Sequence, residues 1–314
     1  MIGTSASAAG ARKLCEAAFG IPSGKFVAQQ LAALGITDFI SVPGSQILPV
    51  WDALANAGIR LTVPRDERTA AYMAEGYGAA CEFPAVLSCT LGVGVANELV
   101  ALASAVASQS PVLALSPCPP LHKRERIEEV FQGLNSELFF RDVVKDHRVV
   151  DDETELGASL VAAMNSCLAQ QQGPVRVDVA FPLLFRRSWQ SVVRPRPPRR
   201  VQPGNVLVSA GQSKQPRDAT AGSVQLSPGT KHGGVVPFAL GALLACPQAS
   251  VLAITTKDDV LANLSTFATA AAADIAVRVV GTADPTLRAV ADAFGCRSID
   301  TVVAEPATLS IAIE

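Results

Sequence analysis

Short apolar runs alternate with amphipathic helical patterns from residue 24 to residue 185, and this alternation restricts the possible folds more than any other feature. The segment "GKFVAQQLAALG" has helical apolar spacing and ends on a glycine, whereas "DFISVPG" is a buried-strand pattern that ends in a Pro-Gly turn. Repeated alternation of this kind predicts a parallel sheet covered by helices on both faces. The sequence therefore predicts an α/β fold.

A stretch rich in proline and arginine, residues 186–204, interrupts the alternation. Its composition excludes a helix or a central strand and predicts an extended linker. A second, shorter series of strand and helix patterns follows it. We therefore predict two doubly wound parallel-sheet domains, residues 23–185 and a truncated domain at 205–314, joined by an Arg/Pro-rich linker. Residues 1–22 are expected to form a frayed or helical extension rather than a signal peptide.

Composition excludes several classes of partner. Apolar residues make up 49% of the chain and charged residues 17%, with a net charge of −2, so we expect a soluble protein that does not bind nucleic acid. No apolar run approaches the roughly 20 residues of a membrane span. The seven cysteines have no metal-ligand spacing, which favours reduced thiols in the cytoplasm.

A more specific signal comes from three linked segments, "DFISVPGSQILPVWDAL", "RDERTAAYMAEGYGAA" and "TLGVGVANELVALASAVASQSPVLALSP". Together they resemble the pyrimidine-binding domain of thiamine diphosphate (ThDP) enzymes of the acetolactate synthase and 2-oxoacid decarboxylase type. The resemblance extends over about residues 25–185 and includes "FQGLNSELFFRDVVKDHRVV". It implies two domains of the ThDP-binding fold, although the family's middle domain is absent between them.

In that family a glutamate at the start of a helix hydrogen-bonds the aminopyrimidine ring and promotes deprotonation of the thiazolium carbon. The matching residue is Glu67, and a carboxylate partly shielded from water suits such a proton exchange. Alternatively, Glu67 only complements the helix dipole. Asp66 replaces a histidine that is common in the family, which leaves substrate handling open. The resemblance also implies a substrate or cofactor pocket formed by Pro43, Gly44, Ser45, Gln46, Gly92, Gly94, Asn97 and Gln132.

The second domain resembles the family's diphosphate-binding domain through "HGGVVPFALGALLACPQASVLAI" and "NLSTFATA". Between these segments the family has Gly-Asp-Gly, whose aspartate binds Mg²⁺, and about 27 residues later an asparagine that also binds the metal. The corresponding triplet here is Thr256-Lys257-Asp258, and Asp284 follows Lys257 at that spacing. A lysine thus replaces the metal-binding aspartate, and the resemblance implies a degenerate diphosphate and metal site.

We predict a Lys257–Asp284 ion pair in the volume that Mg²⁺ would fill. The alternatives are two solvated, unpaired side chains, or a slip of one residue that makes Asp258 the metal ligand. His232 stands where the family commonly has a large apolar residue that supports the cofactor. ThDP is therefore possible by resemblance, but we expect this chain alone not to bind it with Mg²⁺.

Three functions are compatible with these features. The first is a ThDP-type lyase or carboligase acting on a small 2-oxoacid or related anion, with a partner chain that completes the site. The second is a ThDP-independent enzyme that reuses the crevice around Glu67, where the Gly-rich turn and Asn97 bind a small anionic substrate. The third is a non-catalytic scaffold or regulatory homologue. The resemblance implies a homodimer or a heteromer with another ThDP-domain chain.

Overall fold

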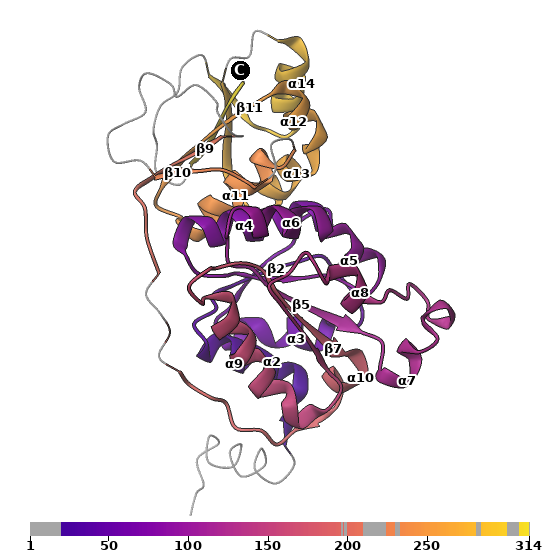
Figure 1. Ribbon diagram of the computed structural model, residues 1–314. Coiled ribbons are helices and arrows are strands. Elements are labelled where there is room, and N and C mark those ends of the chain that lie inside the picture. Colours follow the sequence, from indigo (N-terminus) through magenta and orange to yellow (C-terminus); the bar gives the residue numbers. More distant parts are fainter. Residues whose placement is uncertain are drawn as a thin grey trace, which may run out of the picture.

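The computed structural model describes residues 20–195, 197, 200–209, 224–229, 233–280, 284–299 and 308–313. They form two α/β domains, each built on a six-stranded sheet (Figure 1). Within each of these two sheets every pair of neighbouring strands is parallel. This arrangement confirms the predicted fold class, whereas most of the N-terminal extension lies outside the described residues.

The first sheet has the strand order β3-β2-β4-β5-β7-β6. Its strands are β2 (Asp38–Ser41), β3 (Arg60–Thr62), β4 (Val86–Ser88), β5 (Leu113–Cys118), β6 (Asp146–Val150) and β7 (Val175–Ala180). Residues of β2, β4, β5 and β7 are buried throughout, as expected for central strands with helices on both faces. The chain passes from β2 to β3 on one side and then to β4 on the other, so a crevice is expected where these three strands end.

Helices connect these strands. They are α2 (Ser23–Ala33), α3 (Leu48–Leu54), α4 (Glu67–Cys81), α5 (Val93–Asn97), α6 (Leu99–Ala107), α7 (Leu121–Arg124), α8 (Ser136–Phe140), α9 (Leu156–Cys167) and α10 (Phe181–Leu184). Helix α4 begins where it does because the Asp66 side chain accepts a hydrogen bond from the Thr69 amide at 2.7 Å. It ends at Cys81, because the next residue, Glu82, has a left-handed backbone with φ 53°.

The second sheet has the order β10-β9-β11-β14-β12-β13. Its strands are β9 (Asn205–Ser209), β10 (Val224–Leu226), β11 (Ser250–Thr255), β12 (Ala276–Val280), β13 (Arg297–Ile299) and β14 (Thr308–Ile313), and its helices are α11 (Val235–Ala245), α12 (Lys257–Ala262), α13 (Leu264–Ala272) and α14 (Pro285–Ala293). The sequence patterns did not predict β10 or β14. Strand β14, the last in the chain, lies between β11 and β12 and pairs with both.

The described part of the linker lies along the first domain. It begins with β8 (Arg187–Ser188), which pairs antiparallel with β1 (Ile21–Pro22). Further on, the Gln30 side chain makes two hydrogen bonds to the Val193 backbone, both of 2.8 Å. Arg200 donates to the Tyr77 hydroxyl at 2.7 Å. These contacts attach the linker to the first domain before the chain enters the second.

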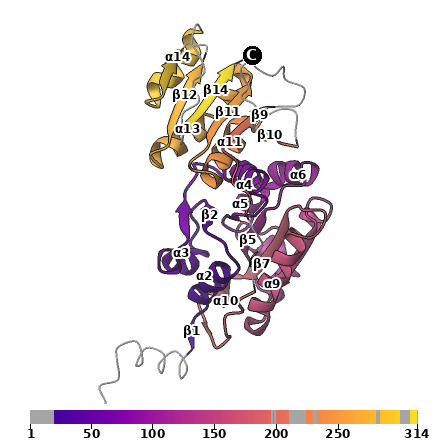
Figure 2. The same ribbon diagram turned by 90° about the vertical axis from the view of Figure 1, so that its left-hand side faces the viewer.

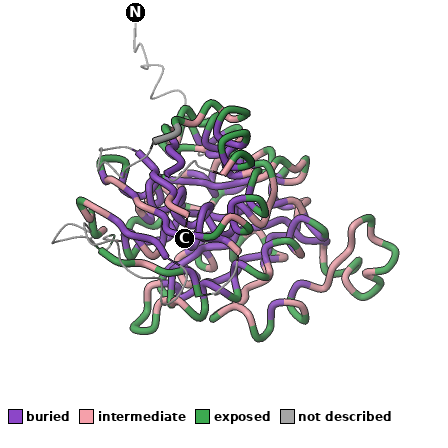
Figure 3. The backbone as a smooth tube through the Cα atoms, turned by 90° about the horizontal axis from the view of Figure 1, so that it is seen from above, coloured by how far each residue is buried: buried purple, intermediate pink, exposed green. Residues whose placement is uncertain are grey.

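The two domains meet where α11 lies against α4 (Figures 1 and 2). Every residue of α11 is buried, as expected for a helix that is apolar on all sides. Two glycines let the backbones touch: a Cβ on Gly76 would lie 1.9 Å from the Phe238 carbonyl oxygen, and one on Gly241 1.9 Å from that of Met73. Buried residues therefore fill the middle of the molecule, and exposed residues lie at its periphery (Figure 3).

Among the described residues, no helix has both the length and the apolar character that crossing a membrane requires.

Candidate active site

Glu67 is the first residue of α4 and follows the carboxyl end of β3. Its Oε2 atom accepts a hydrogen bond of 3.0 Å from the Asn97 side-chain amide, at the end of α5. The preceding residue, Asp66, caps α4. Burial of the Asp66 carboxyl opposes its ionisation, but hydrogen bonds from Ser265 and Thr69 favour it, and the pKa of Asp66 is lowered. The structure thus brings together two predicted site residues that are 30 positions apart.

The Gly-rich turn before α5 is shaped by two glycines. Gly92 has a φ of +74°, and a Cβ there would lie 1.6 Å from the Gln132 carbonyl oxygen. Because no side chain fits in that space, only glycine permits this approach. A Cβ on Gly94 would lie only 3.2 Å from Glu67 Oε1, so this glycine lets the carboxylate lie close to the turn.

The turn after β2 completes the first-domain side of the site. The Thr90 hydroxyl donates to Gln46 Oε1 at 2.9 Å, and a Cβ on Gly44 would lie 2.6 Å from the Thr90 Cβ. Pro43 and Ser45 are on the same turn. The predicted residues therefore come from the carboxyl ends of β2, β3 and β4, which are adjacent in the sheet, and from the Gln132 loop.

The second domain of the same chain contacts the start of α4 directly. Arg68 donates to the Ala262 carbonyl at 2.6 Å. The hydroxyl groups of Thr69 and Ser265 are 2.9 Å apart, and the Arg65 amide donates to the Thr269 hydroxyl at 3.2 Å. Helices α12 and α13 therefore lie over the segment that carries Glu67.

The lysine that replaces the family's metal-binding aspartate is paired. Lys257 Nζ lies 2.7 Å from Asp284 Oδ2, which confirms the predicted contact. Asp284 also caps α14, where its Oδ1 accepts from the Thr286 amide at 2.8 Å. Both side chains of the pair are partly exposed. The Lys257 ammonium thus contacts the Asp284 carboxylate, which is the residue at the spacing of the family's second metal ligand. These two residues therefore do not fit a Mg²⁺ site.

Two other predicted residues of the degenerate site, Thr256 and Asp258, lie at the start of α12. Thr256 caps α12, which starts at Lys257, and its hydroxyl accepts from the Asp259 amide at 3.2 Å. Asp258 lies in the first turn of that helix and is exposed. His232 lies outside the described residues.

A carboxylate that sequence reasoning missed, Asp259, lies behind this turn. It is 7% exposed and accepts hydrogen bonds of 2.8 Å from the Gly234 amide and from the Thr255 hydroxyl. Asn263 adds a third hydrogen bond at 3.0 Å. Asp259 therefore places a negative charge at the N-terminus of α11, a position that favours anions. The signal that could have found it is the Asp–Asn spacing of four residues in "DVLAN".

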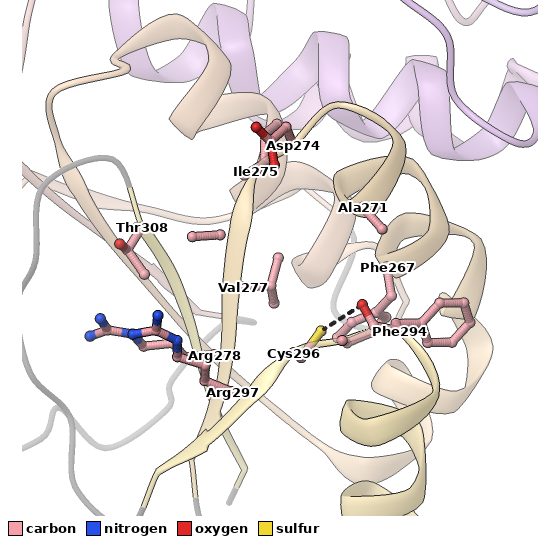
Figure 4. A pocket seen from close by; sticks show the side chains of 12 residues that line it. Phe267, Ala271, Asp274, Ile275, Val277, Arg278, Phe294, Cys296, Arg297 and Thr308 are labelled. Atoms are coloured by element: carbon pink, nitrogen blue, oxygen red, sulfur yellow. Dashed lines mark hydrogen bonds between the residues drawn. The ribbon is translucent and has the colours of Figure 1, made fainter.

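A separate pocket of about 530 Å³ opens in the second domain (Figure 4). Its lining includes the first residues of β12, β13 and β14, which are Ala276, Arg297 and Thr308. The rings of Phe267 and Phe294 stack at a centroid distance of 5.9 Å beside it. Because it lies at the amino edge of the sheet, this pocket is not part of the site around Glu67.

Comparisons with known proteins relate part of this chain to a known family. Residues 23–142 match the family described as "Thiamine pyrophosphate enzyme, N-terminal TPP binding domain". The chain is 29% identical over 176 residues to the acetolactate synthase of Bacillus subtilis, covering 55% of this chain and 30% of that protein. It is 35% identical over 98 residues to the acetolactate synthase large subunit IlvG of Mycobacterium tuberculosis, covering 31% and 18%.

A third relative is the 2-succinyl-5-enolpyruvyl-6-hydroxy-3-cyclohexene-1-carboxylate synthase of Chlorobium phaeobacteroides, 42% identical over 164 residues. This match covers 50% of the chain and 28% of the relative. The aligned parts thus span less than a third of the length of these curated relatives.

Proposed function

Because residues 23–142 match the family of N-terminal TPP-binding domains of thiamine pyrophosphate enzymes, we propose that the chain is a lyase or carboligase of this type. Its substrate would be a small 2-oxoacid or a related small anion. The observation that supports this most is the position of Glu67 at the start of α4, hydrogen-bonded to Asn97 and beside Gly94 of the Gly-rich turn.

In this proposal Glu67 holds and transfers a proton. Asn97 donates to Oε2, which orients the carboxylate and leaves Oε1, beside Gly94, as the atom that exchanges the proton. The backbone of the Gly-rich turn offers N–H groups to an anionic substrate. Thiamine diphosphate, where it is bound, supplies a nucleophilic carbon for the cleavage and formation of C–C bonds.

The second domain makes this a non-standard member of the family. Its Lys257–Asp284 pair and buried Asp259 do not fit a magnesium-bound diphosphate, so we assign no step to that group in this chain. A partner chain with an intact diphosphate-binding domain would have to supply it.

A second candidate function follows from the contacts of α12 and α13 with the start of α4. Because this chain's own second domain already covers that segment, a partner's domain would have to displace it. The second candidate is therefore an enzyme that needs no thiamine and uses Glu67 as general acid or base on a small anion.

The test is calorimetric titration of the full chain with thiamine diphosphate and Mg²⁺, alone and with Lys257→Asp, beside turnover assays on a panel of small 2-oxoacids. Binding gained only by Lys257→Asp would support the non-standard site.

Glu67→Gln should abolish turnover and leave the fold intact, whereas Glu82→Gln, which changes an exposed glutamate at the end of the same helix, should leave both unchanged. Turnover retained by Glu67→Gln would refute both enzyme functions.

A further inference from the structure

A buried series of charged side chains lies behind Asn97, outside the crevice. Glu98 Oε2 is 2.7 Å from Arg176 Nη1, and Arg176 Nη2 is 2.8 Å from Asp178 Oδ1. The series ends at His147, whose Nε2 is 2.8 Å from Asp178 Oδ2. Glu98 and Arg176 have no exposed side-chain surface, whereas the His147 side chain is 11% exposed.

Stability alone does not account for such a series. Removing a carboxylate and a guanidinium from water costs several kcal/mol for each ion, and apolar residues of similar volume often replace such a pair without loss of stability. What a buried pair can add is a defined geometry. Arg176 is well suited to this, because its planar guanidinium contacts Glu98 and Asp178 and lies 4.5 Å from the centre of the Phe140 ring.

The geometry that this pair defines is that of the junction between α5 and α6. Glu98 is the single residue between the two helices and directly follows Asn97. Glu98 continues the helical backbone, since its amide donates to the Val95 carbonyl at 3.2 Å and its carbonyl accepts from the Leu102 amide at 3.0 Å, so a shift of Glu98 would move Asn97 with it. The ion pair with Arg176, which comes from the central strand β7, ties this junction to the sheet.

We propose that Glu98 and Arg176 are positioning residues for Glu67, acting through Asn97: their buried ion pair holds the α5–α6 junction so that the Asn97 amide donates to the Glu67 carboxylate. This rests on the proposed role of Glu67 in proton transfer. Asp178 and His147 support the far side of the Arg176 guanidinium. Cys89 lies close to Glu98, and burial, followed by the Glu98 charge, raises the pKa of its thiol, so it adds no charge of its own.

The test uses the full chain labelled with ¹⁵N at asparagine, in which NMR reports the side-chain amide of Asn97. The Glu67→Gln variant identifies the Asn97 signal and gives its chemical shift when residue 67 has no carboxylate to accept the hydrogen bond. The paired replacement Glu98→Leu with Arg176→Met removes the ion pair and keeps the volume apolar. We expect it to move the Asn97 signal to the position found in Glu67→Gln, with circular dichroism unchanged.

Arg148→Met is the matched control, since it removes a partly exposed arginine–aspartate pair on neighbouring β6 and should leave the Asn97 signal in place. If the paired replacement does not fold, Arg176→Lys serves instead, because an ammonium cannot contact both carboxylates as a guanidinium fork does. We expect that variant to move the signal part of the way. An Asn97 signal that stays in place in the folded variants overturns the proposal, as does one unaffected by Glu67→Gln.

Turnover gives a separate readout. The paired replacement should lower kcat by roughly 10- to 100-fold with KM little changed, because a misplaced proton-transfer group affects chemistry more than binding. If Glu67→Gln retains turnover while the Asn97 signal responds as expected, the proposed function fails and the structural coupling stands. If kcat is unaffected although the Asn97 signal moves, the pair has no positioning role in catalysis.

Discussion

Lys257 and Asp284, 27 residues apart, form an ion pair of 2.7 Å at the carboxyl edge of the second sheet. Their side chains come from the starts of α12 and α14, which follow β11 and β12 in the chain. The pair leaves the Asp284 carboxylate with an ammonium partner and a helix-capping role.

This pair should make stability depend on pH in the acid range. The hydrogen bond from Lys257 is the main cause that lowers the pKa of Asp284, to about 2 from an ordinary value of 3.8. The stabilising contribution of the ionised Asp284 carboxylate is therefore present above pH 3.8 and is lost as the pH falls towards 2. We expect Lys257→Met to flatten this part of the pH profile of thermal unfolding. Asp258→Asn, which changes a neighbouring acid, should not; a profile unaltered by Lys257→Met would contradict the interpretation.

Glu75 should have the opposite effect near neutrality. It is fully buried on α4, and its Oε1 accepts from the hydroxyls of Ser104 and Ser108 at 2.8 Å and from the Gly229 amide at 3.1 Å. Burial raises the pKa of Glu75 from 4.5 to about 7, although these hydrogen bonds oppose the shift. Its stabilising contribution is thus complete below pH 4.5 and is lost as the pH rises to about 7.

Glu75→Gln should remove this dependence, since an amide oxygen can accept the same three hydrogen bonds without a charge. The loss of stability between pH 4.5 and 7 should shrink by a free energy of the order of 3 kcal/mol, because one pKa unit corresponds to about 1.4 kcal/mol. Urea unfolding at several pH values measures it. Equal pH slopes for the two proteins would show that Glu75 does not titrate in this range.

The contact between α4 and α11 predicts a strong response to one methyl group. In Gly241→Ala the new Cβ would meet the Met73 carbonyl oxygen at 1.9 Å, so the helices must separate. We expect a loss of about 1–3 kcal/mol in the free energy of unfolding, as for other overpacked cores. Gly204→Ala is the control, because a Cβ added at Gly204 would have no neighbouring atom within 4 Å. Similar denaturation midpoints for both variants would exclude close backbone packing at this interface.

The described thiols should react slowly in the folded protein. Cys89, Cys118 and Cys167 are buried, and burial raises the pKa of the Cys118 and Cys167 thiols to about 12. Cys296, half-buried at the pocket of Figure 4, has its pKa raised to about 11 by burial. With Cys15 replaced by serine, alkylation at about pH 8 should be slow until denaturant is added, because the thiolate is the reactive form. Rapid labelling of any of these residues in the folded chain would contradict this.

The resemblance to a known family singled out Glu67, the glycines of the turn and Asn97, and the β–α alternation predicted that they follow strand ends. The structure brings Glu67 and Asn97 into contact. The Lys257–Asp284 contact was also predicted, because the resemblance places these two residues at the spacing of the family's two metal ligands. Asp259 was missed, since nothing local distinguishes a buried carboxylate from its more exposed neighbour Asp258.

The sequence by itself determined that this chain forms two parallel α/β units and that a glutamate opens the helix after β3, because hydrophobic periodicity and helix capping act over a few residues. Only the tertiary structure decided that β14 enters the middle of the second sheet, that α11 packs on α4 of the same chain, and that Arg176 pairs with Glu98, 78 residues away. These depend on contacts between distant segments, whose free energy is gained only when both surfaces are buried together.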